Sequence, residues 1–174
     1  MQAGAWLDLG TGPGWIAVHA ASGNPDLDVV GIDTSSTMLE LAEANKRGRL
    51  NVTLRRMDAG EVIYTAETFD VVTAVQVAHH WPEPANILAE AHRVLKVGGK
   101  LYLYEADPAS EVPQGWIARW GPWPPDAWVR RQWARYGMDE EAWNRLMEAV
   151  RASPFGDDVV EERHGFYRRA VCTR

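Results

Sequence analysis

The stretch Trp6–Trp15 reads WLDLGTGPGW: an apolar run reaches an acid, and glycines then occupy every second position of Gly10–Gly14. Ala5–Leu9 is predicted to be a strand and Pro13–Ala21 a helix, because proline suits a first helical turn. Glycines between a strand and a helix let the backbone approach a ligand closely. The stretch therefore predicts an α/β fold with a ligand at this turn, although a tight turn without a ligand would use the same glycines.

The alternation of strand and helix continues to about residue 107. Further strands are predicted at Leu27–Asp33, Asn51–Asp58, Phe69–Ala78 and Lys100–Ala106. Helices are predicted at Ser35–Gly48, with a serine cap and Met38, Leu41 and Ala42 on one face, and at Glu83–Gly99, ended by Gly98 and Gly99, with Ile87, Leu88, Ala91, Val94 and Leu95 facing inward. Such alternation favours a parallel sheet with right-handed crossovers.

The last third of the chain differs in composition. Residues 107–156 are rich in proline and tryptophan, and helical patterns cover Asp126–Tyr136 and Asp139–Ala152. Residues 157–174 read as two strands around His164-Gly165, which predicts a terminal hairpin.

The composition limits the classes of function. A length of 174 residues suits one domain over residues 1–174, and a net charge of -6 argues against sequence-independent binding of nucleic acid. No apolar run approaches the roughly 20 residues that a membrane helix needs. Cys172 is the single cysteine, so no internal disulfide can form, as expected in a reducing compartment. We therefore expect a cytoplasmic protein without membrane or nucleic-acid partners.

Three acids, Asp8, Asp33 and Asp58, lie at the ends of consecutive predicted strands. A carboxylate such as Asp8 is unfavourable beside a pyrophosphate and favourable beside an ammonium or a sulfonium. Asp33 can accept from both hydroxyls of a ribose, and Asp58 lies where an adenine would reach. The dinucleotide fingerprint needs a glycine where Trp15 stands, and the chain has no P-loop. The predicted ligand has a ribose, an adenine and a cationic tail, and no phosphate.

The stretches WLDLGTGPGW, VVGIDTSSTMLELAEA, RRMDAGEV, FDVVTAVQVAHHW and ILAEAHRVLKVGGKLYLYE cover about Trp6–Glu105. In order and spacing they resemble the motifs of class I S-adenosylmethionine-dependent methyltransferases, most of all the group with ubiquinone-biosynthesis and small-molecule enzymes. The resemblance implies a Rossmann-like, doubly wound, seven-stranded sheet that is mostly parallel, with its last strand antiparallel and helices on both faces. Residues 1–106 would form the cofactor-binding half, residues 107–156 a helical insert or lid, and residues 157–174 the hairpin.

The resemblance implies a cofactor role for each matching residue. Asp8 would reach the methionine ammonium through water, Asp33 would hold the ribose hydroxyls, and Asp58 would bond the adenine amino group. The other implied neighbours of the cofactor are Gly10, Thr11, Gly12 and Gly14 beneath it, Thr34 beside the ribose, Met38 and Ala59 near the adenine, and Gln76 and Val77 next to the methionine moiety. No metal is implied.

Methyl transfer is an in-line displacement that needs mainly positioning and exclusion of water. A base helps only where the nucleophile must lose a proton. His79 and His80 lie just past the fourth strand, so either is a candidate base for a hydroxyl acceptor; alternatively, they line the cofactor or have a structural role. The tetrapeptide Asn-Pro-Pro-Tyr of adenine and amide N-methylation is absent, which argues against those reactions.

Residues 107–156 lie where the related enzymes often carry a lid over the substrate. Trp116 and Trp120 are candidate walls of an apolar or aromatic acceptor pocket, and the alternative is a small helical cap that packs its own core. Related enzymes also have one or two helices before the first strand, for which there is no room here. A misassigned start, cover by the insert or cover by a second subunit would explain this, and we therefore expect a homodimer.

The leading prediction is a methyltransferase that moves a methyl group to a small-molecule acceptor through oxygen, nitrogen or carbon. One alternative is a protein of the same fold that binds the cofactor without turnover. The other is a Rossmann-type oxidoreductase, which is disfavoured by Trp15, by Asp8 and by the missing phosphate-facing glycine.

Overall fold

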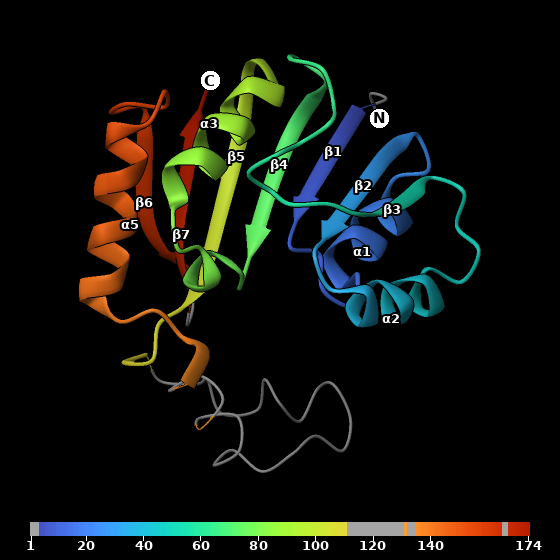
Figure 1. Ribbon diagram of the computed structural model, residues 1–174, viewed down its shortest axis with the longest axis horizontal. Coiled ribbons are helices and arrows are strands. Elements are labelled where there is room, and N and C mark those ends of the chain that lie inside the picture. Colours follow the sequence, from blue (N-terminus) through green and yellow to red (C-terminus); the bar gives the residue numbers. More distant parts are fainter. Residues whose placement is uncertain (1–3, 111–130, 132–134, 165–166) are drawn as a thin grey trace.

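The computed structural model of this chain describes residues 4–110, 131, 135–164 and 167–174. Figure 1 shows its strands, which are β1 (Gly4–Leu9), β2 (Leu27–Asp33), β3 (Val52–Arg56), β4 (Phe69–Val75), β5 (Leu95–Ala106), β6 (Val159–His164) and β7 (Tyr167–Thr173). The helices are α1 (Trp15–Gly23), α2 (Ser36–Lys46), α3 (Pro84–Val94) and α5 (Glu140–Ala152), together with the short 3-10 helix η1 (Ala78–His80).

The strands form one sheet in the order β3-β2-β1-β4-β5-β7-β6. β1 to β5 pair in parallel, and β7 runs antiparallel to both of its neighbours, β5 and β6. The predicted doubly wound, seven-stranded sheet with an antiparallel last strand is therefore confirmed. The strand order changes direction between β1 and β4, and open sheets of this kind bind ligands in the crevice at such a switch point.

Helices cover both faces of the sheet, and β1 shows how. Leu7 and Leu9 point to a large core that includes α3 and α5, whereas Trp6 packs with Ala17 and Ala21 of α1 on the other face. Figure 1 shows α3 and α5 side by side over the half of the sheet that holds β5 and β7, with α1 and α2 at the half that holds β1 to β3. Successive side chains of β1 point to opposite faces of the sheet, so this one strand contributes to the hydrophobic cores on both faces.

The predicted helix Glu83–Gly99 is too long. α3 ends at Val94, and Leu95 already belongs to β5, where it pairs with Phe69 of β4. Gly98 has a φ angle of 77°, and a Cβ atom on Gly99 would lie 2.8 Å from a backbone oxygen. These glycines therefore shape an irregular start of β5 and do not end a helix.

The predicted helix Pro13–Ala21 is shifted, since α1 spans Trp15–Gly23 and Pro13 lies in the turn before it. The end of one strand and the buried face of α2 also differ from the prediction. The strand predicted to reach Ala78 ends at Val75, and the chain then turns through η1. On α2, Ser35 is the cap, its hydroxyl accepting from the amide of Met38 at 3.3 Å. Met38 is exposed, and only Ala42 of the three predicted face residues is buried, because the glycine turn packs against it.

α5 and the two terminal strands follow the sequence pattern, whereas most of the predicted helix Asp126–Tyr136 lies outside the described residues. Asp139 caps α5 by accepting from the amide of Ala142 at 2.8 Å. The buried side of α5 consists of Trp143, Leu146, Met147 and Val150. β6 and β7 pair from Val159 to His164, so the predicted hairpin is confirmed. In the part of the chain that the structure describes, no helix has the length and apolar content needed to span a membrane.

Candidate functional site

The glycine turn after β1 has backbone angles that favour glycine. Gly10, Gly12 and Gly14 have φ angles of 62°, 53° and 78°, all in the left-handed region. A Cβ atom on Gly10 would lie 2.2 Å from Cγ2 of Val77, and one on Gly14 would lie 2.9 Å from Cβ of Ala42. The lack of a side chain at Gly10 thus lets the segment after β4 pack closely against the turn, and the lack of one at Gly14 does the same for α2.

Asp33, at the end of β2, ties the glycine turn to the start of α2. Its Oδ2 accepts a hydrogen bond from the amide of Gly12 at 2.9 Å, and its Oδ1 accepts one from the amide of Ser35 at 2.8 Å. Each carboxylate oxygen has capacity for a further hydrogen bond. Asp33 is half-buried and lines a cavity, so that capacity is open to a ligand.

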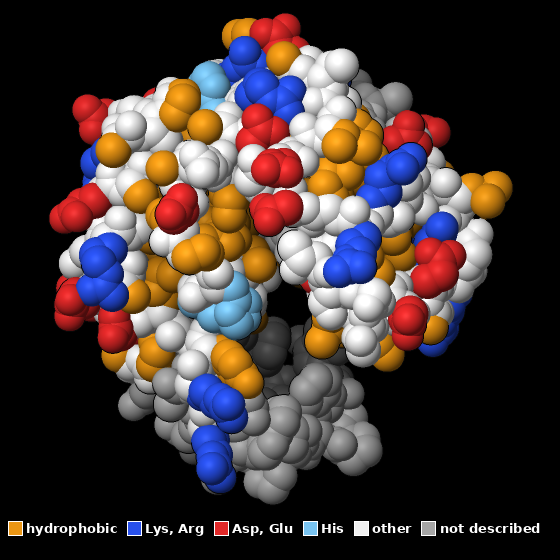
Figure 2. All heavy atoms as spheres, viewed as in Figure 1, with side chains coloured by type: hydrophobic (Ala, Val, Ile, Leu, Met, Phe, Trp, Pro, Cys, Tyr) orange, Lys and Arg blue, Asp and Glu red, His pale blue; other side chains and the backbone are white. Residues whose placement is uncertain are grey.

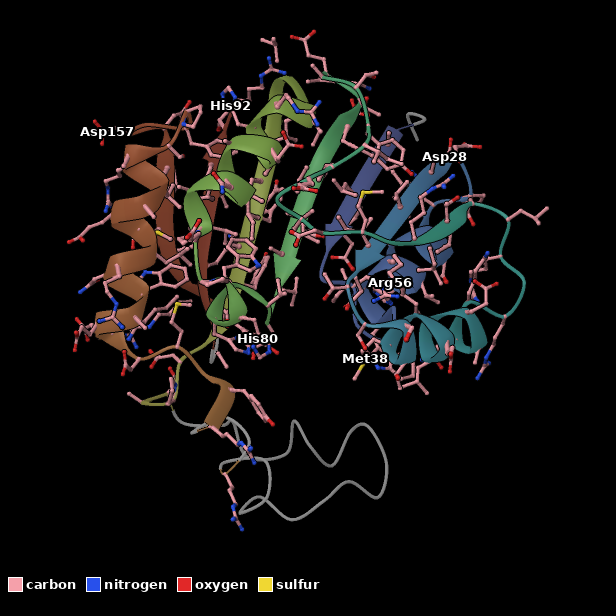
Figure 3. All side chains as sticks on the ribbon, viewed as in Figure 1. Asp28, Met38, Arg56, His80, His92 and Asp157 are labelled. Atoms are coloured by element: carbon pink, nitrogen blue, oxygen red, sulfur yellow. The ribbon has the colours of Figure 1, made fainter. Side chains whose placement is uncertain are left out.

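This cavity measures about 620 Å³ and lies at the switch point between β1 and β4. Figure 2 shows a hollow between the two halves of the molecule, and Figure 3 shows His80 of η1 and Met38 of α2 on opposite sides of it. The described residues that line it are Gly10, Gly12, Asp33, Thr34, Ser35, Met38, Met57, Asp58, Ala59, Gln76, Val77, His80, Trp81, Pro82 and Ile87. None of these described residues is a lysine or an arginine, so a phosphate would meet no cation among them.

The structure brings most of the predicted cofactor residues to this one cavity. Asp8, Thr11 and Gly14 are the exceptions, since they are buried and not among the lining residues. Five lining residues were not predicted from the sequence: Ser35, Met57, Trp81, Pro82 and Ile87. The first three are chain neighbours of predicted residues.

Asp8 is expected to reach the methionine ammonium, yet its carboxylate is enclosed in the sheet. It accepts hydrogen bonds from the hydroxyls of Thr73 at 2.6 Å and Thr11 at 2.7 Å. Burial raises the pKa of Asp8 from 3.8 to about 6, against the opposing effect of these two hydroxyls. A buried carboxylate held only by neutral donors favours a cation nearby.

Asp58 follows β3 on a segment that runs along the cavity. Its Oδ1 accepts from the amide of Gly60 at 2.7 Å, and its side chain is otherwise exposed. Ala59 is small and also lines the cavity. With Oδ1, Asp58 therefore helps to fix the shape of this turn, and its Oδ2 is available to a ligand.

Gln76 follows β4 with a φ angle of 54°, which is uncommon for a residue other than glycine. Its backbone amide donates to the carbonyl of Tyr104 at 2.8 Å. Its side-chain Nε2 is buried and has no hydrogen-bond partner among the described residues. Such a group is expected to find a partner, and Gln76 lines the cavity.

Glu105, in β5, holds the turn that carries both histidines, and it was not among the site residues predicted from the sequence. Its carboxylate is fully buried; Oε1 accepts from the amides of Val77 at 3.0 Å and Ala78 at 2.7 Å, with a longer contact from the amide of His79 at 3.4 Å. Its Oε2 lies 2.9 Å from Nδ1 of His79. The sequence did contain a sign of this role: Glu105 continues the alternating, inward-facing positions of Leu101 and Leu103 in β5, where a charged residue is unusual.

The two histidines face different spaces. His80 lines the large cavity, and His79 lines a second one. Trp116 and Trp120 lie outside the described residues, so their role as pocket walls stays a prediction. Within the described part of the chain, no group of histidine, cysteine, aspartate and glutamate side chains is arranged to hold a metal ion.

The cavity suits the predicted ligand. Gly12 has no atom within 4 Å of the place where its Cβ would stand, so a ligand can lie against the backbone there. Asp33 and Asp58 offer polar contacts along the wall. An open α/β sheet with such a site is typical of proteins that bind a nucleoside-containing cofactor.

Comparison with known proteins identifies the family. Residues 7–103 match the methyltransferase domain family. The chain is 37% identical over 102 residues to the 27-O-demethylrifamycin SV methyltransferase of Amycolatopsis mediterranei, an overlap of 56% of this chain and 36% of that protein. It is 33% identical over 109 residues to a ubiquinone/menaquinone biosynthesis C-methyltransferase of Desulfotalea psychrophila, an overlap of 63% and 44%. The chain thus spans less than half the length of these relatives.

The fold agrees with that of solved methyltransferases. The crystal structure of an S-adenosylmethionine-dependent methyltransferase from Aquifex aeolicus superposes with a TM-score of 0.69 at 20% identity, over 99% of this chain and 82% of that one. Since the family match covers more than half of the chain, this protein belongs to the methyltransferase domain family, whose cofactor is S-adenosylmethionine. The resemblance seen in the sequence motifs is confirmed.

Proposed function

We propose that this chain binds S-adenosylmethionine and catalyses transfer of its methyl group to a small-molecule acceptor. The observation that supports this most is the cavity at the switch point. It combines Asp33 and Asp58 with the open backbone at Gly12, and no lysine or arginine stands among its described lining residues.

The resemblance to the methyltransferases implies which residues hold the cofactor, and the position of most of them around the cavity supports these roles. Asp33, with Thr34, would accept from the ribose hydroxyls, and Asp58 would accept from the adenine amino group between Met38 and Ala59. Gln76 and Val77 would lie against the methionine moiety, and Asp8 would attract its ammonium through water, with Thr11 and Gly14 holding the turn behind Gly10 and Gly12.

When bound, S-adenosylmethionine supplies a methyl group whose carbon–sulfur bond breaks as the acceptor atom bonds to carbon, which leaves neutral S-adenosylhomocysteine. The protein's own contribution is positioning and exclusion of water. For a hydroxyl acceptor, His79 or His80 would also accept the proton that the acceptor loses. The relatives' names include a 27-O-demethyl substrate and a C-methyltransferase, so the acceptor atom of this chain stays open.

Calorimetry with S-adenosylhomocysteine tests the cofactor assignment. The Asp33→Ala variant loses at least two charge-assisted hydrogen bonds of roughly 1.5–3 kcal/mol each, so its affinity should fall by about 100-fold or more. Asp28→Ala is the matched control, because Asp28 is an exposed residue at the opposite end of β2, as Figure 3 shows. An unchanged affinity in Asp33→Ala would remove the ribose assignment.

Two further outcomes separate the alternatives. Binding of NAD in place of S-adenosylhomocysteine would favour the oxidoreductase. Tight binding of S-adenosylhomocysteine with no methyl transfer to any member of a broad acceptor panel would favour a cofactor-binding protein without turnover. The predicted homodimer and the cytoplasmic location stay predictions.

A further inference from the structure

A second cavity, of about 330 Å³, lies between η1 and the start of α5. The described residues that line it are Ala78, His79, Trp81, Pro82, Pro84, Gly137, Met138, Ala142, Arg145 and Leu146. Most of these side chains are apolar, and His79 and Arg145 are the polar exceptions. The exposed guanidinium of Arg145 is already paired with Glu141 on the same helix, so it does not demand an anionic ligand.

This cavity adjoins the cofactor cavity. Trp81 and Pro82 line both spaces, so the two cavities adjoin at these two residues. The rings of His79 and His80 lie 4.1 Å apart, with one histidine in each space. A molecule in the second cavity would therefore sit next to one in the first.

Glu105 determines which ring nitrogen of His79 is available. Its Oε1 is occupied by backbone amides, and its Oε2 faces Nδ1 of His79. A carboxylate oxygen only accepts hydrogen bonds, so Nδ1 must carry the proton of this contact. In the neutral ring the lone pair then lies on Nε2. No partner for Nε2 is found among the residues that the structure describes.

We propose that the cavity between η1 and α5 receives a neutral, ring-bearing methyl acceptor whose hydroxyl meets Nε2 of His79, and that Glu105 sets this tautomer. The proposal rests on the proposed function and deepens it. The apolar walls and the volume suit a molecule of one or two rings. The hydroxyl proton passes to Nε2 as the oxygen reacts, and the carboxylate of Glu105 stabilises the imidazolium that results.

The cavity is tested with 2-naphthol as the probe, by calorimetry in the presence of S-adenosylhomocysteine. Ala142→Leu adds volume to the cavity wall and should weaken 2-naphthol at least tenfold, with the affinity for S-adenosylhomocysteine changed less than twofold. Ala152→Leu, on the exposed end of α5, is the matched control and should change neither affinity. Equal 2-naphthol binding in Ala142→Leu, or none by the natural chain, would overturn the cavity assignment.

The role of Glu105 is tested by the nitrogen-15 spectrum of the five histidines, with a His79→Gln variant for assignment. The natural chain should show His79 protonated at Nδ1 with a bare Nε2, and 2-naphthol should shift the Nε2 signal. In Glu105→Gln the amide oxygen can still accept from the backbone, whereas the amide nitrogen would face Nδ1 and reverse the tautomer. A proton on Nε2 in the natural chain, or no shift with 2-naphthol, would contradict the proposal. Failure of the proposed function would appear separately, as no binding of S-adenosylhomocysteine.

Discussion

Two turns close the cofactor cavity, and they are held in different ways. The turn Gly10–Gly14 follows β1 and owes its shape to its own glycines and to Asp33, which accepts from the amide of Gly12. The turn Gln76–His80 follows β4 and contains no glycine; its amides donate to the buried carboxylate of Glu105, which lies on the next strand.

The two turns differ in where the residues that fix their shape lie: mainly within the turn itself after β1, and on another strand for the turn after β4. The φ angles of the first turn are encoded by its own glycines, and one hydrogen bond from Gly12 to Asp33 of the neighbouring strand β2 adds to them. The second turn is held by Glu105, which the pairing of β4 with β5 places beneath it. The two turns meet where Val77 packs onto Gly10. Variants at this contact and around it show whether the two turns act as one unit.

Gly10→Ala should have the largest effect on stability. Its Cβ would lie 2.2 Å from Cγ2 of Val77, and the φ angle of 62° adds strain for any residue other than glycine. We expect the free energy of unfolding, measured in urea, to fall by about 3 kcal/mol or more. Adding Val77→Ala removes the nearest methyl group and should restore part of the loss. If the double variant is no more stable than Gly10→Ala, the turns are not coupled at this contact.

Asp8→Asn should have the next largest effect, with the opposite sign. Burial raises the pKa of Asp8 from 3.8 to about 6, so the folded chain binds more protons than the unfolded chain between these values. The contribution of Asp8 to stability therefore falls as pH rises from about 4 to about 6, and above that range the ionised carboxylate is a net cost. Asparagine removes the charge, so the variant should be more stable at pH 7 by about 1–3 kcal/mol.

The pH dependence identifies the cause of this effect. The difference in unfolding free energy between Asp8→Asn and the natural chain should be small below about pH 4 and constant above about pH 6 to 7. The variant should also bind S-adenosylhomocysteine less tightly, if Asp8 attracts its ammonium. A difference that does not change with pH would mean that packing, and not the buried charge, is responsible.

Most of the fold and of the cofactor site could be predicted from sequence because the signals are local. The acid at the end of β2 and the glycines after β1 each carry their own geometric reason, and Asp33 and Gly12 indeed lie at one cavity. The burial of Asp8 could not be predicted, because it comes from packing in the sheet beside Thr73 of β4, which is a neighbour of β1 in the sheet but lies far away in the sequence. The end of α3 was also misplaced, because pairing with Phe69 decides where β5 begins.

The smallest expected effect concerns the segment that carries Asp58. Glu90 and Arg93 of α3 clamp this segment from outside the cavity: Arg93 donates to the carbonyls of Val62 at 2.7 Å and Tyr64 at 2.8 Å, and Glu90 accepts from the amide of Val62 at 2.9 Å. The same guanidinium also bonds both oxygens of Glu90. Glu90 and Arg93 therefore hold the segment that forms one wall of the cofactor cavity, although neither residue lines the cavity.

Arg93→Lys should loosen this wall, because an ammonium cannot reproduce the fixed fork of a guanidinium. Arg93 is partly exposed, so the loss should be modest: about a three- to tenfold weaker affinity for S-adenosylhomocysteine, with faster amide exchange confined to residues 57–64. Arg151→Lys is the matched control, since Arg151 forms an exposed ion pair with Glu161 far from the segment. Faster exchange spread over all of α3, or unchanged affinity despite faster exchange at residues 57–64, would show that the clamp stabilises the fold and does not organise the cofactor site. Weaker affinity together with faster exchange limited to residues 57–64 would show that this wall is held differently from the two turns. The glycines hold the turn after β1 and a buried carboxylate holds the turn after β4, whereas this wall would be held by side chains on the surface of α3.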